Sequence, residues 1–98
     1  MELILTERAY KDLAEIKEYI SLDNPTAAKE LLSDFEKALD NLALMPKIGH
    51  INQTLTNKNV RFLNVKKYVI IYKINDDNIA VIRISSTYRD IYEMLSDY

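Results

Sequence analysis

Apolar residues recur three and four positions apart in two adjacent stretches of the first half of the chain, a spacing that places them on one face of a helix. The first stretch contains Ala9, Leu13, Ile16 and Ile20. The second contains Ala28, Leu31, Phe35, Ala38, Leu42 and Met45. Between them, Asn24 suits a helix N-cap and Pro25 suits the first helical position. The pattern therefore predicts two antiparallel helices joined by a short connection.

The second half of the chain changes to runs of β-branched and aromatic residues, which are typical of strands. These runs span 60–65, 68–74 and 79–85, and a further short apolar run spans 2–5. Thr87 and Asp90 resemble a capping box for a last short helix. The order β-α-α-β-β-β-α predicts a single α+β domain over residues 1–98. In this fold the helical hairpin packs on one face of a small, mainly antiparallel sheet.

Alternation along the strands assigns side chains to the two faces of the predicted sheet. In the last strand, Ile82 and Ile84 belong to an apolar set that is expected to meet the helices, which leaves Arg83 on the uncovered face. The same alternation assigns Arg61 to the uncovered face. Two guanidinium groups on one open face suit phosphate or carboxylate. The alternative for Arg83 is an ion pair with a nearby acid, such as Asp90.

Charge is divided unevenly along the chain. Residues 46–75 contain no Asp or Glu, whereas residues 1–45 hold ten acids and five bases, and the net charge is −2. The bases of this acid-free segment are Lys47, Lys58, Arg61, Lys66, Lys67 and Lys73. A basic surface on an acidic scaffold indicates an anionic partner, either nucleic acid or an acidic protein segment. The alternative is that these lysines only keep exposed strands solvated.

The composition excludes several kinds of site. The chain has no Cys, one Gly and one His, so disulfides, phosphate-cradling glycine loops and histidine metal clusters are not expected. We interpret His50 as structural and Asp76-Asp77 as turn residues. No cofactor and no metal are predicted.

No apolar run approaches the roughly 18 residues that cross a bilayer. The first ten residues, MELILTERAY, carry acids at Glu2 and Glu7 and differ from a signal peptide. We therefore expect a cytoplasmic protein with no membrane partner.

Six short segments carry a combined pattern across nearly the whole chain. They are residues 14–20, 24–28, 42–49, 61–63, 68–72 and 83–91. In this order and spacing they resemble the RelE/ParE toxin superfamily. The resemblance implies a small growth-inhibiting toxin from a plasmid-stabilisation type II toxin–antitoxin module. It also implies a hetero-oligomer with a cognate antitoxin, which is expected to bind through an acidic or amphipathic segment.

One branch of this superfamily, the RelE-like branch, consists of ribosome-dependent mRNA endonucleases (mRNA interferases). Such enzymes need cations around the scissile phosphate and a base for the ribose 2′-hydroxyl. The branch commonly places an arginine directly after the tyrosine that opens the central strand. In this chain Tyr68 is followed by Val69, which has no charge for a phosphate. Arg89 matches a second arginine of the branch.

The ParE-like branch consists of inhibitors of DNA gyrase with no known catalytic set. An arginine in the last strand, here Arg83, and the segment 88–91 match this branch with one departure, Tyr88. Together with the valine at position 69, this favours a ParE-like toxin that poisons gyrase. The alternatives are a RelE-like endoribonuclease acting on ribosome-bound mRNA and a non-toxic interaction domain.

The candidate site residues follow from these readings. Those for binding the target or a phosphate are Lys58, Arg61, Lys66, Lys67, Arg83 and Arg89. No catalytic residue is established, but an endonuclease would use Arg61, Arg83, Tyr88 and Arg89, with Tyr88 transferring the proton. The residues that bind the antitoxin are not assigned by the sequence.

Overall fold

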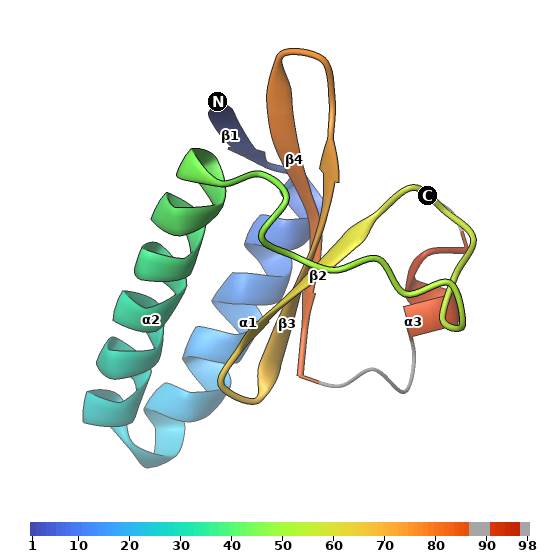
Figure 1. Ribbon diagram of the computed structural model, residues 1–98. Coiled ribbons are helices and arrows are strands. Elements are labelled where there is room, and N and C mark those ends of the chain that lie inside the picture. Colours follow the sequence, from blue (N-terminus) through green and yellow to red (C-terminus); the bar gives the residue numbers. More distant parts are fainter. Residues whose placement is uncertain (87–90, 97–98) are drawn as a thin grey trace.

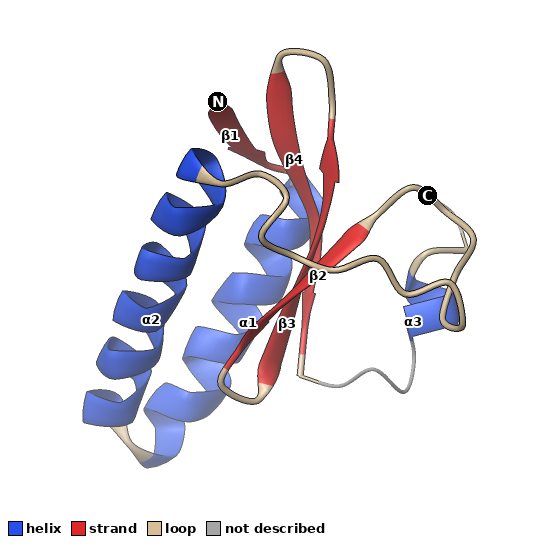
Figure 2. Cartoon of the chain, in the orientation of Figure 1, coloured by secondary structure: helices blue, strands red, loops and turns tan. Residues whose placement is uncertain are grey.

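The computed structural model describes residues 1–86 and 91–96 and forms two helices packed on a four-stranded mixed sheet (Figure 1). The elements are β1 (Glu2–Leu5), α1 (Glu7–Asp23), α2 (Pro25–Leu44), β2 (Arg61–Val65), β3 (Tyr68–Ile74), β4 (Asn78–Ser85) and α3 (Ile91–Met94). The strand order is β1-β4-β3-β2, with β1 parallel to β4 and the other pairs antiparallel. The predicted α+β class and element order are confirmed (Figure 2).

Both long helices begin at capping residues, Thr6 for α1 and Asn24 for α2, and the second confirms the cap predicted from the sequence. The Thr6 side chain accepts a hydrogen bond from the Ala9 backbone N–H at 3.2 Å. Asn24 ends α1 and also caps α2, where its side chain accepts from the Ala27 N–H at 3.0 Å, and Pro25 follows as the first helical residue. These caps satisfy backbone donors that a helix leaves unpaired at its start. The hairpin boundary is therefore set by local sequence.

The main core lies between the helical hairpin and one face of the sheet. The helices contribute Ala9, Leu31, Phe35 and Leu42. The strands contribute Val65, Ile70, Tyr72, Ile79, Val81 and Ile84. We name this side of the sheet the helix face.

The other side of the sheet is also covered in part, by α3 and by the end of the segment before β2, from which Leu55 and Val60 pack there (Figure 1). A second apolar cluster fills the space beneath them, and its buried members are Val60, Phe62, Val69, Ile71, Ile82, Ile91 and Leu95. We name this side the loop face. The sequence prediction of an uncovered face is wrong, because α3 and the long segment before β2 supply apolar side chains that pack there.

Side-chain alternation in β4 is interrupted at one residue. Val81 pairs with Tyr72 and Arg83 pairs with Ile71, so Ile82 is an extra residue without a partner in β3. Such a bulge resets which face the following side chains meet. Ile82 packs on the loop face and Ile84 on the helix face. The prediction that these two isoleucines share a face is wrong for this reason.

The phenol of Tyr72 ties the segment after α2 to the central strand. Its hydroxyl donates to the Pro46 carbonyl at 2.7 Å and accepts from the Gly49 N–H at 2.8 Å. Burial raises the pKa of Tyr72, while the Gly49 bond and the Arg61 charge act in the opposite direction. A Cβ on Gly49 would lie 2.6 Å from the Tyr72 ring, so this position needs glycine for lack of space.

Replacing Tyr72 by phenylalanine is expected to lower the free energy of unfolding by about 1–3 kcal/mol, because the Pro46 carbonyl and the Gly49 N–H each lose a partner. Urea unfolding followed by circular dichroism measures the change. Tyr10→Phe is the matched control at an exposed position, where no change is expected. Equal stability of both variants would contradict the anchoring role of the Tyr72 hydroxyl.

Candidate functional site

Arg61 opens β2 and lies on the helix face. It pairs with Tyr72 across β2 and β3, and its chain neighbours Val60 and Phe62 both pack on the loop face. The Arg61 Nη1 atom donates to the Gly49 carbonyl at 2.8 Å. The predicted placement of Arg61 on an uncovered face is therefore wrong, and the half-buried guanidinium helps to hold the segment that follows α2.

Arg83 is held by a carboxylate of α1. Its Nε donates to Asp12 Oδ2 at 2.7 Å and its Nη2 donates to Asp12 Oδ1 at 3.1 Å. The two side chains are only 14% and 8% exposed. The prediction that Arg83 projects from an uncovered face is wrong. The alternative of an ion pair with an acid is confirmed, with Asp12 as the acid. Asp90, the example named from the sequence, lies outside the described residues.

Because β1 is short, α1 can approach the edge of β4 and bring Asp12 close to Arg83. β1 pairs with β4 only as far as Val81, and α1 lies along the edge of β4 beyond that point. Thr6 donates from its N–H to the Val81 carbonyl and from its hydroxyl to the Ile82 carbonyl. Asp12 Oδ2 accepts from the Ile84 N–H at 3.0 Å. The helix thus satisfies edge groups of β4 that a longer β1 would have paired.

Sequence reasoning missed Asp12, although the sequence carried a signal for it. Asp12 lies three residues after Ala9 and four before Ile16, within the apolar stripe that faces the core. An acid at such a position is costly to bury unless a cation and hydrogen bonds satisfy it. Arg83 and the Ile84 N–H meet that requirement.

Arg61 and Arg83, the two candidate arginines that the structure describes, do not converge on one site. Arg61 lies on β2 and Arg83 on β4, with β3 between them, so their strands are separated by about 10 Å. Their side chains bond to different elements, Arg61 to Gly49 and Arg83 to Asp12 of α1. This arrangement does not form a two-arginine phosphate site.

The candidate lysines are dispersed as well. Lys66 and Lys67 form the exposed turn between β2 and β3, where Lys66 adopts φ 56°. Lys58 is half-buried in the segment before β2, and its N–H donates to Thr56 Oγ1 at 3.1 Å. β2 separates Arg61 from the Lys66-Lys67 turn, a distance of about 15 Å along the strand. The sequence-predicted binding residues therefore occupy several parts of the surface.

Val69 is a core residue. It is 1% exposed and packs in the loop-face cluster with Ile71 and Ile91. Tyr88 and Arg89, the remaining candidates for a nuclease, lie outside the described residues. Position 69, where the nuclease branch commonly has an arginine, therefore carries a buried apolar side chain with no charge.

His50 has a structural contact, as its interpretation from sequence requires. Its backbone exchanges two hydrogen bonds with Phe62, at 2.9 and 2.8 Å, outside the edge of β2. The imidazole ring lies 5.9 Å from the Phe62 ring. Asp76 and Asp77 are exposed in the turn between β3 and β4, which agrees with their assignment as turn residues.

Within residues 1–86 and 91–96, no set of three or more His, Cys, Asp or Glu side chains is placed to bind a metal ion. In the same part of the chain, every helix is too short or too polar to cross a bilayer.

Comparison with known proteins decides the family. Residues 3–91 match the model of the ParE toxin of type II toxin–antitoxin systems, parDE. The chain belongs to the ParE toxin family. It is therefore the toxin component of a type II module, a class whose partner is a protein antitoxin.

Two similar proteins extend this assignment. The ParE-family toxin is 32% identical over 83 residues to a protein named Toxin RelE2 from Caulobacter vibrioides, covering 85% of this chain and 91% of the relative. A solved structure described as the chromosomal ParDE TA system from P. aeruginosa superposes with a TM-score of 0.74 at 20% identity. The match covers 87% of this chain and 94% of that one, and it confirms the fold.

Asp12→Ala and Arg83→Ala are each expected to lower the free energy of unfolding by about 3 kcal/mol, because each leaves a buried charge without its partner. Chemical denaturation of the purified toxin measures the loss. Glu15→Ala is the control. Glu15 lines the same surface pocket as Asp12 and Arg83 but is exposed, and a change below about 0.5 kcal/mol is expected there.

The same variants separate a structural role of Arg83 from a role in target binding. If Arg83→Ala keeps full stability and loses toxicity, the structural role is wrong and the binding role predicted from sequence holds.

Proposed function

We propose that this ParE-family toxin stops growth by binding and poisoning DNA gyrase, without cutting RNA itself. The observation that carries the proposal is Val69, a buried residue of the loop-face cluster at the position where an RNA-cutting relative is expected to hold an arginine. A valine in a closed apolar cluster can neither bind a phosphate nor stabilise developing negative charge.

The two candidate arginines that the structure describes support the same proposal. A phosphoryl-transfer site needs several cations aimed at one set of oxygens. Arg61 and Arg83 are instead bonded to a loop carbonyl and to a helix carboxylate on opposite sides of β3. Both guanidinium groups thus contribute to the fold, and inhibition through surface contacts with a large target requires neither of them to be free.

Neither described tyrosine with a perturbed pKa suits proton abstraction. Burial raises the pKa of Tyr72, and burial together with the nearby Tyr19 raises the pKa of Tyr68. A phenol with a raised pKa holds its proton more firmly at neutral pH and is a poorer general base.

The proposed partners are a cognate antitoxin and, as the target, DNA gyrase. This proposal places the toxin in the cytoplasm, in a hetero-oligomer with the antitoxin until it is released.

Purified toxin is expected to inhibit DNA supercoiling by gyrase in a dose-dependent manner, and addition of the antitoxin is expected to restore supercoiling. The measurement is an agarose-gel assay with relaxed plasmid. A parallel reaction with translating ribosomes and a labelled mRNA is expected to show no toxin-dependent cleavage. Cleavage of mRNA with unchanged supercoiling would overturn the proposal.

A RelE-like endoribonuclease is the second candidate, favoured by the name of the 32%-identical relative, Toxin RelE2. In that case Tyr88→Phe and Arg89→Ala are expected to reduce mRNA cleavage by at least about 100-fold, as expected for a lost proton-transfer or charge-stabilising group. Under the gyrase proposal, Tyr88→Phe retains growth inhibition in a bacterial host. Growth curves after induced expression distinguish the two candidates.

A further inference from the structure

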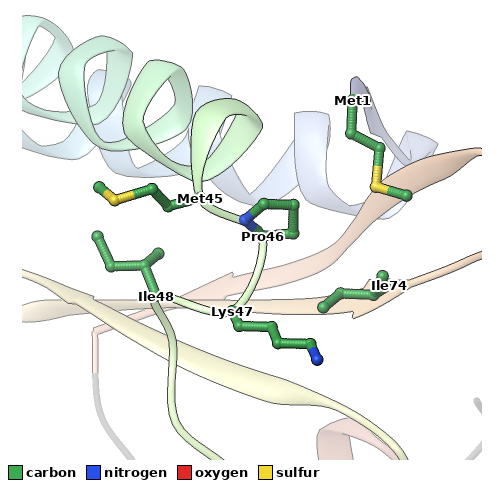
Figure 3. Close-up of a pocket in the computed structure, with 6 residues that line it drawn as sticks. All are labelled: Met1, Met45, Pro46, Lys47, Ile48 and Ile74. Atoms are coloured by element: carbon green, nitrogen blue, oxygen red, sulfur yellow. The ribbon is translucent and has the colours of Figure 1, made fainter.

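An apolar pocket lies where the chain leaves α2, between the start of β1 and the end of β3. Its lining residues are Met1, Met45, Pro46, Lys47, Ile48 and Ile74, and its volume is about 570 Å³. We name it the α2-end pocket. Figure 3 shows Met45 and Ile48 on one side of Pro46, and Met1 and Ile74 on the other.

The apolar side chains around the α2-end pocket are unusually open to solvent. Met1 is 50%, Met45 52% and Ile48 43% exposed, and Leu44, directly before Met45, is 80% exposed. Single exposed apolar residues are common, but a contiguous group around a hollow indicates a surface that a partner covers. The pocket therefore has the character of a protein-binding site.

The wall of the pocket is fixed before any partner arrives. Tyr72 holds both ends of the segment 46–49 through the Pro46 carbonyl and the Gly49 N–H, and Arg61 bonds to the Gly49 carbonyl. The Ile48 N–H donates to the Met45 carbonyl at 3.0 Å. A preformed pocket spares a binding partner the entropy of ordering it.

Charge selects the kind of partner. The charges on the residues that line the pocket are positive: they are the Lys47 ammonium and the N-terminal ammonium of Met1, which donates to the Ala43 carbonyl. Lys47 lies at the start of the acid-free segment 46–75. An acidic side chain beside an apolar one matches this combination. The exposed Asp76 and Asp77 follow Ile74 closely in the chain, so a partner's acid has to lie on the Lys47 side of the pocket.

A second copy of this chain fits the pocket less well. A two-fold symmetric contact places the same patch of both copies face to face. Here that contact would bring one Lys47 toward the other, with an unfavourable interaction between like charges. A different, acidic protein avoids this repulsion.

We infer that the antitoxin inserts one large apolar side chain into the α2-end pocket and places an acidic residue of the same segment against Lys47. The inference rests on the proposed function, since it assigns the surface through which a toxin of this kind is recognised by its antitoxin. The apolar contact supplies affinity, and the acid near Lys47 sets the orientation of the segment.

The test is the dissociation constant between the full toxin and the protein encoded by the reading frame beside its gene, measured by titration calorimetry. Ile48→Glu and Lys47→Glu are each expected to raise it at least about tenfold, through loss of a buried apolar contact or reversal of a paired charge. Matched controls are Leu22→Glu, which replaces another exposed apolar residue, and Lys17→Glu, which makes the same charge change on the exposed side of α1. Both controls are expected to stay within about twofold of the original protein, because surface changes outside an interface have small effects.

Thermal unfolding of each variant checks that the fold is intact. Ile48→Ala is added because it removes only apolar atoms from a half-exposed position, and it is expected to weaken binding in the same direction by a smaller factor. Raising the salt concentration is expected to shrink the difference between Lys47→Glu and the original protein, because salt screens exposed charges.

Equal affinity of the pocket and control variants overturns the inference, as does the absence of any complex with the original toxin. Loss of gyrase inhibition in Ile48→Glu with undiminished antitoxin affinity also overturns it and assigns the pocket to the target. Inhibition of gyrase supercoiling by the original toxin tests the proposed function separately, so failure of the inference and failure of the proposed function are distinguishable.

Discussion

The second half of β4 depends on the bonds that the Asp12 carboxylate makes to Arg83 and to the Ile84 N–H. β1 ends at Leu5, and beyond it the sheet needs another source of hydrogen bonds at this edge. Asp12 provides one by accepting a hydrogen bond from the Ile84 N–H, and it also accepts from Nε and Nη2 of Arg83. One side chain thus joins α1 to the sheet, closes an exposed edge and orients an arginine. Because a planar guanidinium matches a carboxylate at two points, the pair has a defined geometry.

Tyr72 has a comparable role at the other end of the helical hairpin. Its hydroxyl lies in the core and bonds to the chain just after α2, so the exit of the hairpin is joined to the central strand. Gly49 is held from two sides, by Tyr72 through its N–H and by Arg61 through its carbonyl. The lack of space for a Cβ follows from this close approach. The same contacts give the α2-end pocket a rigid wall.

The basic segment 46–75 does not form one cationic patch in the described structure, contrary to what its charge pattern suggested. Arg61 is part of a loop contact, Lys66 and Lys67 form a turn at the start of β3, and Lys47 lies by the pocket near the end of β3. The length of β3 separates these ends by about 20 Å. Charges spread in this way, together with an apolar pocket, suit recognition of large protein partners better than chemistry at one phosphate.

The sequence by itself determined the elements and the family. Thr6, Asn24 and Pro25 mark the helix boundaries through contacts within a few residues, and the change from helical to strand periodicity is equally local. The segments from 14–20 to 83–91, read in order, were enough to recognise the toxin superfamily. The burial of Val69 agrees with its place in a strand that is apolar on both faces.

Only the tertiary structure decided where the arginines point. Strict alternation along β4 fails because Ile82 is an extra residue, and a bulge exists only relative to the partner strand β3. The acid that binds Arg83 is 71 residues away in the sequence. The apolar stripe of α1 marks Asp12 as an acid that needs a partner, but no local pattern assigns Arg83 to it. Helix packing against the half-covered edge of β4 makes that assignment, since a buried carboxylate requires partners that only this edge supplies.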